Sequence, residues 1–387
     1  MRVYAAWLRP IIVFMSNGKS NGHGHDGGAE LPAALPSPLA ALQAILPAKG
    51  GMLIIPHDYP DPDAFASAAA MHLLLREKFG VRSRIVFTGM VNRAENREML
   101  KHCRYSFTLA TRLQLGRKRP AALVLDGVPW SGRVTVPPGA RVIGVIDHHP
   151  QTRAKKGFEG LMDFRPGLGA TASILYEYLK AADVAVPPWL AALLVYAIAT
   201  ETLDFSRRFT PLDLEAYTAL LPRANLKILG EIRHAPLPRP YFAHLREAMD
   251  HAQVYGRVAW SHLDAVEQPE IVPEIADLLS RIERVTWTFC TAWRGDDLLI
   301  SLRSSQPGAR CGALLKAVVR DQGSAGGHFN MAAGVLNLAG RPLEEREERR
   351  EELVRSLLGW IERRSAEAEE PLDILAHPLV DKKTAAE

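Results

Sequence analysis

Acids and histidines are concentrated in three short stretches of the chain, at spacings that suit metal binding. The candidates are His57, Asp61 and Asp63 in HDYPDPDA, Asp126 in AALVLDG, and Asp147, His148 and His149 in VIDHHP. Carboxylates gathered at one place repel one another unless cations neutralise them. Carboxylate oxygens together with neutral imidazole nitrogens suit manganese, and also magnesium, iron or zinc. Two such ions about 3.5–4 Å apart are a common arrangement for the hydrolysis of phosphate esters, so these residues favour that chemistry.

Apolar runs predict the elements that position these residues. The runs are GGMLIIP (50–56), SRIVFTG (83–89), AALVLDG (121–127) and RVIGVID (141–147), and each is typical of a buried parallel strand. A helix between the first two begins near Asp63 and ends at Gly80. This alternation predicts an α/β domain with a mostly parallel sheet flanked by helices. Because ligands bind at the carboxyl ends of the strands in open α/β sheets, the acids and histidines are expected to meet at one edge.

Each of these features, taken singly, has an ordinary alternative explanation. Asp63 or Asp126 alone is explained as a helix cap, and a lone pair of adjacent histidines is more often part of the surface than a ligand pair. The combination of acids and histidines at three strand ends favours a metal site over these separate explanations.

The rest of the chain indicates a second domain. Helices are predicted at 169–182, 189–201 and 211–222, and the proline-rich RHAPLPRPY (233–241) then indicates a linker. Strands at about 253–260, 285–293 and 297–303 and helices at 271–283 and 309–321 predict a smaller α/β domain. The expected division is a disordered tail at 1–37, a first domain at 38–225, a linker at 226–250, a second domain at 251–345, and a charged C-terminal helix and tail at 346–387.

The composition is that of an ordinary globular protein. The 387 residues are 47% hydrophobic and 23% charged, and the net charge of +4 suits an anionic substrate without requiring a protein that coats nucleic acid. Three distant cysteines indicate a reducing compartment, so we expect a cytoplasmic location. The N-terminal MRVYAAWLRPIIVFM is too short to span a bilayer, so we expect no association with a membrane. A signal peptide is the less favoured alternative. A simpler explanation of this segment is that translation begins at Met15.

Five motifs, in this order, resemble those of the DHH phosphoesterase superfamily with a DHHA1 domain. They are HDYPDPDA, Asp126, DHH, TET (200–202) and SAGGHFNMAAG (324–334). The superfamily includes RecJ-type exonucleases, nanoRNA and 3′-phosphoadenosine-5′-phosphate phosphatases, cyclic-dinucleotide phosphodiesterases and family II inorganic pyrophosphatases, and a DHHA1 domain argues against the last branch. The resemblance implies an N-terminal DHH domain, a C-terminal DHHA1 domain and an active site in the cleft between them.

The resemblance also implies a set of metal ligands. His57 and Asp61 would bind one ion, Asp63 and His148 would bind the other, and Asp126 would bridge the two. The expected cofactor is a pair of divalent ions, Mn²⁺ in the first place and Mg²⁺ as the alternative.

Two further residues of the DHH motif complete the implied catalytic group. Asp147 would orient the site by accepting a hydrogen bond from an imidazole, and His149 would face the substrate phosphate. With Asp126 and His148, they form the implied catalytic set.

The chain departs from the motifs of the superfamily at three positions. Tyr59 stands where the first motif has Asn, and Pro62 stands where Gly is usual. In the fourth motif Glu201 stands where an Asp ligand is usual, and we expect Glu201 to be the last metal ligand because it supplies the same oxygens. Asp204 is the alternative ligand, and a further alternative is that Glu201 is only a surface acid of its helix.

The second domain is expected to bind the substrate. Arg303 matches a phosphate-binding arginine, and its planar fork suits that task. The glycine-rich turn offers backbone N–H groups to phosphate oxygens. The implied substrate-binding residues are His149, Arg303, Ser304, Gly326, Gly327 and His328.

The sequence therefore predicts a metal-dependent phosphoesterase, a phosphoric ester hydrolase that acts on short RNA or DNA oligonucleotides or on small nucleotides through a metal-activated water. A cyclic-dinucleotide phosphodiesterase and a non-catalytic or regulatory nucleotide-binding protein of the same fold are the alternatives. The superfamily also suggests a homodimer.

Overall fold

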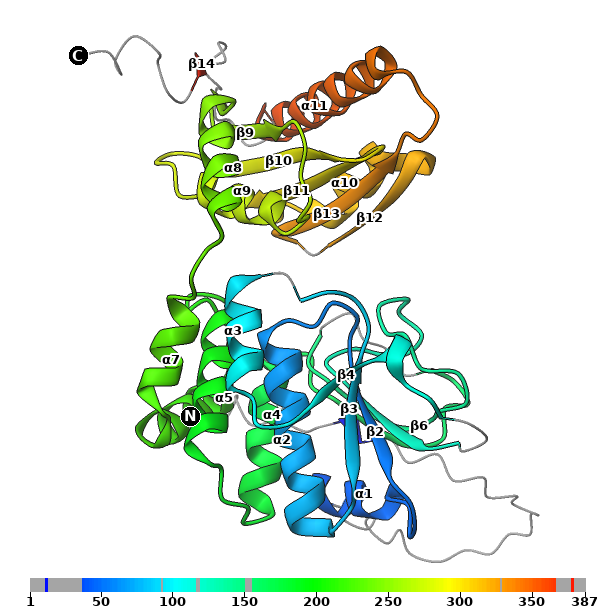
Figure 1. The fold of residues 1–387 in the computed structure, drawn as a ribbon. Helices are drawn as coiled ribbons and strands as arrows, with labels where there is room; N and C mark the ends of the chain where they lie inside the picture. Colours follow the sequence, from blue (N-terminus) through cyan, green and yellow to red (C-terminus); the bar gives the residue numbers. More distant parts are fainter. Residues whose placement is uncertain are drawn as a thin grey trace, which may run out of the picture. The chain divides into compact units, whose positions relative to one another are not determined.

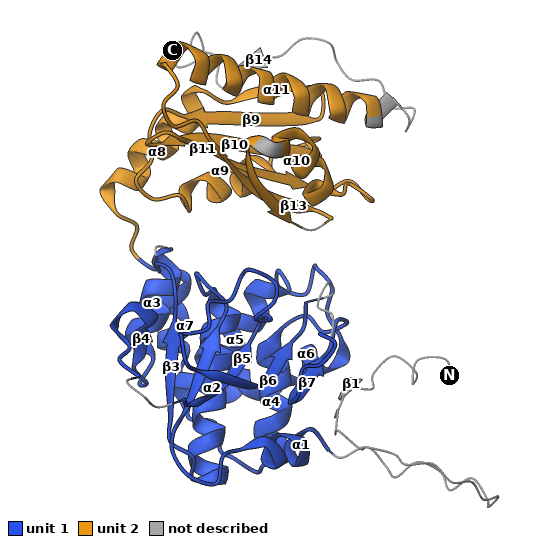
Figure 2. Cartoon of the chain, turned by 90° about the vertical axis from the view of Figure 1, so that its right-hand side faces the viewer, with its two compact units in different colours: residues 1–235 blue, residues 236–387 orange. Residues whose placement is uncertain are grey.

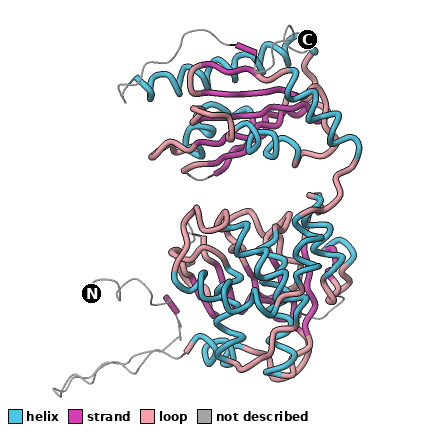
Figure 3. The backbone as a smooth tube through the Cα atoms, turned by 90° about the vertical axis from the view of Figure 1, so that its left-hand side faces the viewer, coloured by secondary structure: helices cyan, strands magenta, loops and turns pink. Residues whose placement is uncertain are grey.

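The computed structural model describes residues 11–12, 37–91, 93–115, 119–149, 155–327, 329–366 and 377–378. The chain forms two compact units, residues 1–235 and 236–387 (Figure 2). In each unit the strands gather into one sheet with helices packed beside it (Figure 3). The expected tail at 1–37, apart from Ile11–Ile12 and Ser37, and the substrate-binding candidate His328 lie outside the described residues.

The first unit is built on a sheet with the strand order β1-β7-β6-β5-β2-β3-β4. Its strands β2, β3 and β4 lie side by side in Figure 1. The strands are β1 (Ile11–Ile12), β2 (Met52–Pro56), β3 (Ser83–Phe87), β4 (Phe107–Leu109), β5 (Ala121–Leu125), β6 (Arg141–Asp147) and β7 (Leu161–Phe164). Strands β2 to β7 pair in parallel, and β1 pairs antiparallel with β7. The four predicted strands and the mostly parallel sheet are confirmed, whereas β1, β4 and β7 were not predicted; β1 lies in the segment that was expected to be disordered.

Helices cover one face of this sheet. They are α1 (Pro38–Ile45), α2 (Pro62–Phe79), α3 (Ala94–His102), α4 (Thr171–Ala181), α5 (Pro188–Glu201), α6 (Pro211–Leu220) and α7 (Leu226–Arg233). Buried side chains of β2 and β5, such as Ile54 and Leu123, share one core with Phe65 of α2 and Leu190 of α5. The alternate residues of the strands face a second core that loop residues such as Val134 complete. Burial on both faces explains why the strands are continuous apolar runs.

The second unit has a sheet with helices on both faces. Its strand order is β12-β13-β11-β10-β9-β8-β14. The strands are β8 (Gln253–Tyr255), β9 (Val258–Leu263), β10 (Trp287–Arg294), β11 (Asp297–Ser304), β12 (Gly323–Gly327), β13 (Met331–Asn337) and β14 (His377–Pro378). The helices are α8 (Arg239–Asp250), α9 (Ile271–Leu279), α10 (Cys311–Val319) and α11 (Leu343–Ala366). Helices α8 and α9 pack into one core, and α10 and α11 pack into the other. The predicted smaller α/β domain is confirmed.

The segment at 226–250 is not an extended linker, because it contains α7 and α8. The division between the units falls after Ala235, inside the proline-rich junction. Pro236 and Pro238 separate the two helices, and Pro240 lies in the first turn of α8, where a missing N–H costs nothing. The prolines therefore mark the break between two helices rather than an unstructured connection. In the part of the chain that the structure describes, no helix is long and apolar enough to cross a bilayer.

Candidate functional site

The candidate metal-binding residues of the first unit lie where three adjacent parallel strands end. His57 follows β2, Asp126 follows β5, and His148 follows β6, and β5 pairs with both of the other strands. Asp61 is the N-cap of α2 and accepts a hydrogen bond from the Ala64 N–H at 3.0 Å. The structure thus brings these side chains together at one edge of the sheet, as the positions of the strand ends predicted.

Asp126 is the central group of this cluster. Its carboxylate is almost fully buried, with one oxygen 3.5 Å from His57 Nε2 and the other 3.6 Å from His148 Nε2. On either side, His57 Nε2 is 3.6 Å from the Asp61 carboxylate, and His148 Nε2 is 3.7 Å from the Asp63 carboxylate. These separations are longer than hydrogen bonds, as expected of groups that share an ion rather than a proton.

The two histidines direct their Nε2 atoms toward this carboxylate. His57 Nδ1 lies 2.8 Å from the Asp58 carbonyl and His148 Nδ1 lies 3.1 Å from the Leu168 carbonyl. A carbonyl oxygen only accepts hydrogen bonds, so Nδ1 carries a proton in each ring and Nε2 is the nitrogen that can bind a metal ion. Both Nε2 atoms are buried without a hydrogen-bond partner in the described structure, an arrangement that is costly without a ligand. This donor set fits divalent cations, and the backbone carbonyls orient the rings as in known metal sites.

The backbone turns sharply at Asp126 to deliver its side chain. Asp126 has a φ of 57°, in the left-handed region that few non-glycine residues adopt. Gly127 follows with a φ of 159°, and a Cβ atom there would lie 3.0 Å from Val134 and 3.3 Å from His57 Cβ. Such local strain persists only where surrounding contacts hold it, and it is concentrated at functional sites.

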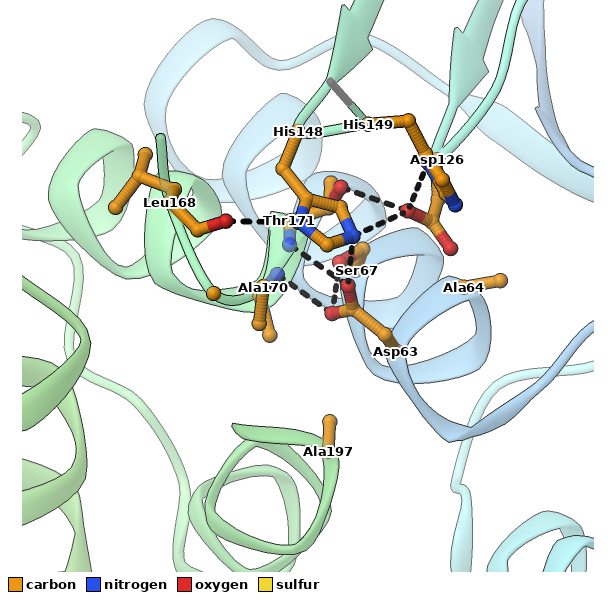
Figure 4. Close-up of polar contacts among 12 residues, drawn as sticks. Asp63, Ala64, Ser67, Asp126, His148, His149, Leu168, Ala170, Thr171 and Ala197 are labelled. Atoms are coloured by element: carbon orange, nitrogen blue, oxygen red, sulfur yellow. Dashed lines mark hydrogen bonds and ion pairs between the residues drawn. The ribbon is translucent and has the colours of Figure 1, made fainter. Parts of the chain in front are cut away.

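The N-terminus of α4 supports the cluster (Figure 4). This support was not predicted from the sequence. The backbone N–H groups of Thr171 and Ala172 each donate a hydrogen bond of 2.7 Å to the Asp63 carboxylate. The Thr171 hydroxyl donates to Asp126 at 2.9 Å. A helix N-terminus favours a carboxylate through its free N–H groups and its dipole. The available signal was the GLGAT turn (167–171) before a predicted helix.

Buried Asp213 of α6 holds this turn in place. Its carboxylate accepts hydrogen bonds from the backbone N–H groups of Gly169 at 2.9 Å and Ala170 at 3.2 Å. It also forms a capping box with Thr210. A Cβ atom on Gly169 would lie 2.6 Å from Thr202 Cγ2 and 3.1 Å from Asp213 Cγ, so only glycine permits this approach. Asp213 therefore positions the turn that carries Leu168 and Thr171.

Replacing Asp213 with Asn is expected to weaken Mn²⁺ binding by about 10–100-fold, the usual effect of losing support behind metal ligands. An amide cannot accept from both N–H groups, so the turn is released. The measurement is a Mn²⁺ titration of the purified protein. The matched control, Thr210→Ala, breaks the same capping box but leaves the Asp213 contacts with Gly169 and Ala170. It should lower stability by about 1 kcal/mol and leave Mn²⁺ affinity unchanged. Unchanged affinity in the Asp213 variant would contradict the positioning role.

The electrostatics of the cluster match a site built for cations. Burial, and then the charges of Asp126 and Asp61, raise the pKa of Asp63 well above its usual range. Burial alone would lower the pKa of His57, but the nearby carboxylates of Asp61 and Asp126 outweigh it and raise the pKa to about 9. Burial also lowers the pKa of His148, but the negative charges around it, that of Asp126 first, outweigh this effect and raise the pKa. Without cations the cluster therefore retains protons, and metal binding would release them.

The structure places the two alternatives for the last ligand differently. Glu201 is the last residue of α5 and is half-buried. Burial, and then the charge of Asp61, raise the pKa of Glu201, and the opposite charge of His148 partly offsets this. Asp204 is exposed in a turn that leaves the helix. Glu201 therefore lies within the electrostatic field of the cluster.

Asp147 and His149 form a close pair beside Asp126. His149 donates a hydrogen bond from Nδ1 to the buried Asp147 carboxylate at 2.7 Å, and its backbone N–H donates to the same oxygen at 3.2 Å. His149 Nδ1 is also 3.6 Å from Asp126. Burial lowers the pKa of His149, but the hydrogen bond to Asp147 outweighs it and the pKa is raised.

Arg303 and Ser304, two of the predicted substrate-binding residues of the second unit, already have partners. Arg303 forms an ion pair with Asp277 at 2.5 Å, and the Ser304 hydroxyl donates to the Thr286 carbonyl at 3.0 Å. Gly327 has a φ of 156°, and its carbonyl oxygen would be only 2.5 Å from a Cβ atom placed on Gly312 of α10. The glycine-rich β12 thus has a packing role next to α10, in addition to any contact with a ligand.

No family model matches the chain. An uncharacterized protein from Methanocaldococcus jannaschii is 30% identical over 291 residues, which are 75% of this chain and 59% of that protein. A probable manganese-dependent inorganic pyrophosphatase from Streptococcus agalactiae is 27% identical over 155 residues, which are 39% of this chain and 48% of that protein. The chain thus spans less than two thirds of the length of these curated relatives.

The crystal structure of an exopolyphosphatase-related protein from Bacteroides fragilis has a TM-score of 0.65 at 16% identity, and the match covers 83% of this chain and 96% of that chain. The chain therefore has a two-domain α/β fold of the DHH type. Because 83% of the chain exceeds the length of either unit, the match includes parts of both. The fold that the motifs predicted is confirmed, and in this DHH fold the cluster around Asp126 occupies the carboxyl edge of the parallel sheet.

Proposed function

We propose that the chain is a metal-dependent phosphoesterase that hydrolyses short oligonucleotides or small nucleotide phosphoesters. The observation that carries the proposal is the pair of buried, unpartnered Nε2 atoms of His57 and His148 on either side of the Asp126 carboxylate. A merely structural cluster would pair these nitrogens with donors, whereas metal ligands need the lone pairs.

The proposed ligands form two groups that share Asp126. His57 and Asp61 belong to the first group, and Asp63, His148 and Glu201 belong to the second. Two divalent ions held there would supply a nucleophilic water at neutral pH and would neutralise charge on the phosphoryl oxygens. Mn²⁺ is the first candidate because the set mixes carboxylates with imidazoles, and Mg²⁺ is the second.

His149 is proposed to contact the substrate phosphate, with Asp147 as its support. The Asp147 carboxylate fixes the ring and favours the imidazolium form, whose second N–H can donate to a phosphate oxygen. The charge that develops on the phosphoryl oxygens during hydrolysis strengthens this hydrogen bond, which makes it a contribution to catalysis and not only to binding.

Residues of the second unit are proposed to bind the rest of the substrate. They are Arg303, Ser304, Gly326, Gly327 and His328. The Asp277 side chain that pairs with Arg303 is 50% exposed, so a phosphate approaching from solvent would compete with it for the guanidinium. A planar guanidinium binds either carboxylate or phosphate in the same two-pronged way.

Turnover measurements test the proposal directly. Purified protein with Mn²⁺ is incubated with dinucleotides, 3′-phosphoadenosine-5′-phosphate, cyclic dinucleotides and inorganic pyrophosphate, and released mononucleotide or phosphate is measured. Metal-dependent release from the linear nucleotides is expected, and a chelator should abolish it. Tight Mn²⁺ binding with no turnover of any substrate would contradict the proposal and favour the non-catalytic nucleotide-binding alternative.

A further inference from the structure

Tyr59 lies in the loop that carries His57 and Asp61, and 63% of it is exposed. A single exposed aromatic residue is ordinary on a protein surface. What distinguishes Tyr59 is the way its backbone and ring are fixed in place. It also stands at the position where the resembling motif has Asn, whose side chain offers no aromatic face.

Three features hold Tyr59 in position. Its φ is 54°, in the left-handed region, and its N–H donates to the Thr88 carbonyl at 2.8 Å. Its ring lies against Gly89, where a Cβ atom would be 2.7 Å from Tyr59 Cδ1 and 2.9 Å from its backbone nitrogen. Any side chain at Gly89 would therefore displace the ring. A left-handed conformation costs a non-glycine residue about 1–2 kcal/mol, so the loop holds Tyr59 against a local preference.

The preceding residue anchors the same loop from its other side. The Asp58 carboxylate accepts hydrogen bonds from the Thr135 N–H at 2.9 Å and from the Thr135 hydroxyl at 2.6 Å. The Asp58 N–H donates to the Arg133 carbonyl at 2.8 Å. The acid beside Tyr59 is thus structural, and the loop presents Tyr59 to solvent as a fixed ring rather than as a mobile side chain.

Gly89, on which the Tyr59 ring packs, lies at the same edge of the sheet as the proposed metal ligands. Gly89 follows β3, which pairs with β2 on the side opposite to β5 and Asp126. Neighbouring strands are about 4.8 Å apart, so the ring lies roughly 10 Å along the sheet edge from Asp126. A nucleotide whose phosphate lies at Asp126 can reach this far with its base. Met90, the residue after Gly89, is 48% exposed and adds apolar surface to this loop.

We infer that Tyr59 is a specificity-determining residue whose ring stacks on a base of the substrate, so that the site favours nucleoside phosphates over inorganic pyrophosphate. This inference rests on the proposed function and names the substrate class for it. Bases of every kind stack on an aromatic ring, so the contact selects for a base without selecting its sequence. Inorganic phosphates have no group for this surface and gain nothing from it.

The test compares Tyr59→Ala with Tyr59→Phe in the full-length, Mn²⁺-loaded protein. Tyr59→Ala is expected to raise KM for 3′-phosphoadenosine-5′-phosphate and for a diadenylate about tenfold or more, in the range of base–aromatic stacking. It should leave kcat within about threefold, since the ring does not touch the scissile bond. Tyr59→Phe should keep the wild-type KM. The matched control is Phe242→Ala, an aromatic residue of the second unit with a similar exposure of 56%, which should change nothing.

Equilibrium binding separates failure of this inference from failure of the proposed function. Binding of 3′-phosphoadenosine-5′-phosphate to the Mn²⁺-loaded protein is measured by calorimetry for the wild type and the variants. If the wild type turns over no substrate, the proposed function fails, and a tenfold weaker affinity in Tyr59→Ala alone still supports stacking. If wild type and Tyr59→Ala bind and hydrolyse the nucleotide equally well, the stacking role is overturned while phosphoester hydrolysis stands. An equal loss for pyrophosphate and nucleotide would also overturn it, since that result indicates a general disturbance of the metal site.

Discussion

Asp126→Asn should abolish metal-dependent hydrolysis, by at least about 1,000-fold, while the protein remains folded. Asp126 is the carboxylate that both histidine nitrogens face, at 3.5 and 3.6 Å, so its loss removes a ligand from both proposed ions. Asn suits the test because it keeps the shape and tolerates the φ of 57° better than most residues. Turnover and Mn²⁺ binding are both measured.

The metal-free variant should also lose some stability. In the absence of ions Asp63 retains a proton, and the Asp126 charge helps to raise the pKa values of His57 and His148, so it stabilises their protonated forms. We expect the metal-free Asp126→Asn protein to melt a few degrees below the metal-free wild type, corresponding to about 1 kcal/mol. Added Mn²⁺ should stabilise the wild type through mass action and should stabilise the variant much less.

A second buried acid of the same unit provides the control. Asp163 on β7 accepts two hydrogen bonds from Arg165 and one from Tyr178, and it is paired with a cation rather than crowded by other acids. Asp163→Asn should therefore lower the melting temperature, because it removes the buried negative charge that pairs with Arg165, and should preserve the response to Mn²⁺. If Asp126→Asn keeps the same response to Mn²⁺ as Asp163→Asn, or keeps wild-type turnover, the bridging role of Asp126 is wrong.

The cluster around Asp126 was predictable because a simple rule places its members. Parallel strands end at one edge, so an acid or a histidine after each apolar run must come together whatever the remaining chain does. His57, Asp126 and His148 needed only the identification of three strands. The role proposed for each side chain came instead from the resemblance to the DHH motifs.

The supporting contacts were not predictable by the same reasoning, because they are made largely by the backbone. The Thr171 N–H donates to Asp63, which is 108 residues away in the chain. Because almost every residue has a backbone N–H group, the sequence does not indicate which of them makes such a contact. Asp213 resembles an ordinary helix-capping acid in the TPLD stretch, and it is one, but its second oxygen also accepts from Ala170 in a loop 43 residues away. Local patterns identify the cap and give no indication of the distant contact.

Glu201 and Asp204 show how a backbone detail decides between two acids of similar spacing. Residues three apart lie on one face of a helix, so the TETLD stretch left both acids as ligands. The helix ends at Glu201, and Leu203, Asp204 and Phe205 all have φ values between 48° and 64°. This left-handed turn is closed by the Asp204 N–H donating to the Ala199 carbonyl at 2.8 Å. It exposes Asp204 to solvent, whereas Glu201 is half-buried at the end of the helix.

Glu201→Gln should therefore reduce kcat/KM by about 100-fold or more, while Asp204→Asn should change it less than about threefold. Gln keeps the length of the side chain and removes the charge that couples to Asp61, Asp126 and His148. Because Glu201 belongs to only one of the two proposed ligand groups, its loss should weaken one Mn²⁺ site and spare the other. A Mn²⁺ titration should then show one tight and one weakened site, in contrast to Asp126→Asn, which disturbs both.

Raising the Mn²⁺ concentration gives the sharper form of this test. If Glu201 acts by holding the second ion, excess Mn²⁺ should restore a large part of the turnover of Glu201→Gln, because mass action refills a weakened site. The same excess should not rescue Asp126→Asn, where the shared ligand is missing. If Glu201 is only an exposed acid of the helix surface, its replacement should neither lower turnover nor make turnover depend on added Mn²⁺. Wild-type turnover in Glu201→Gln, or a large loss of turnover in Asp204→Asn, would therefore show that Glu201 is not the last ligand.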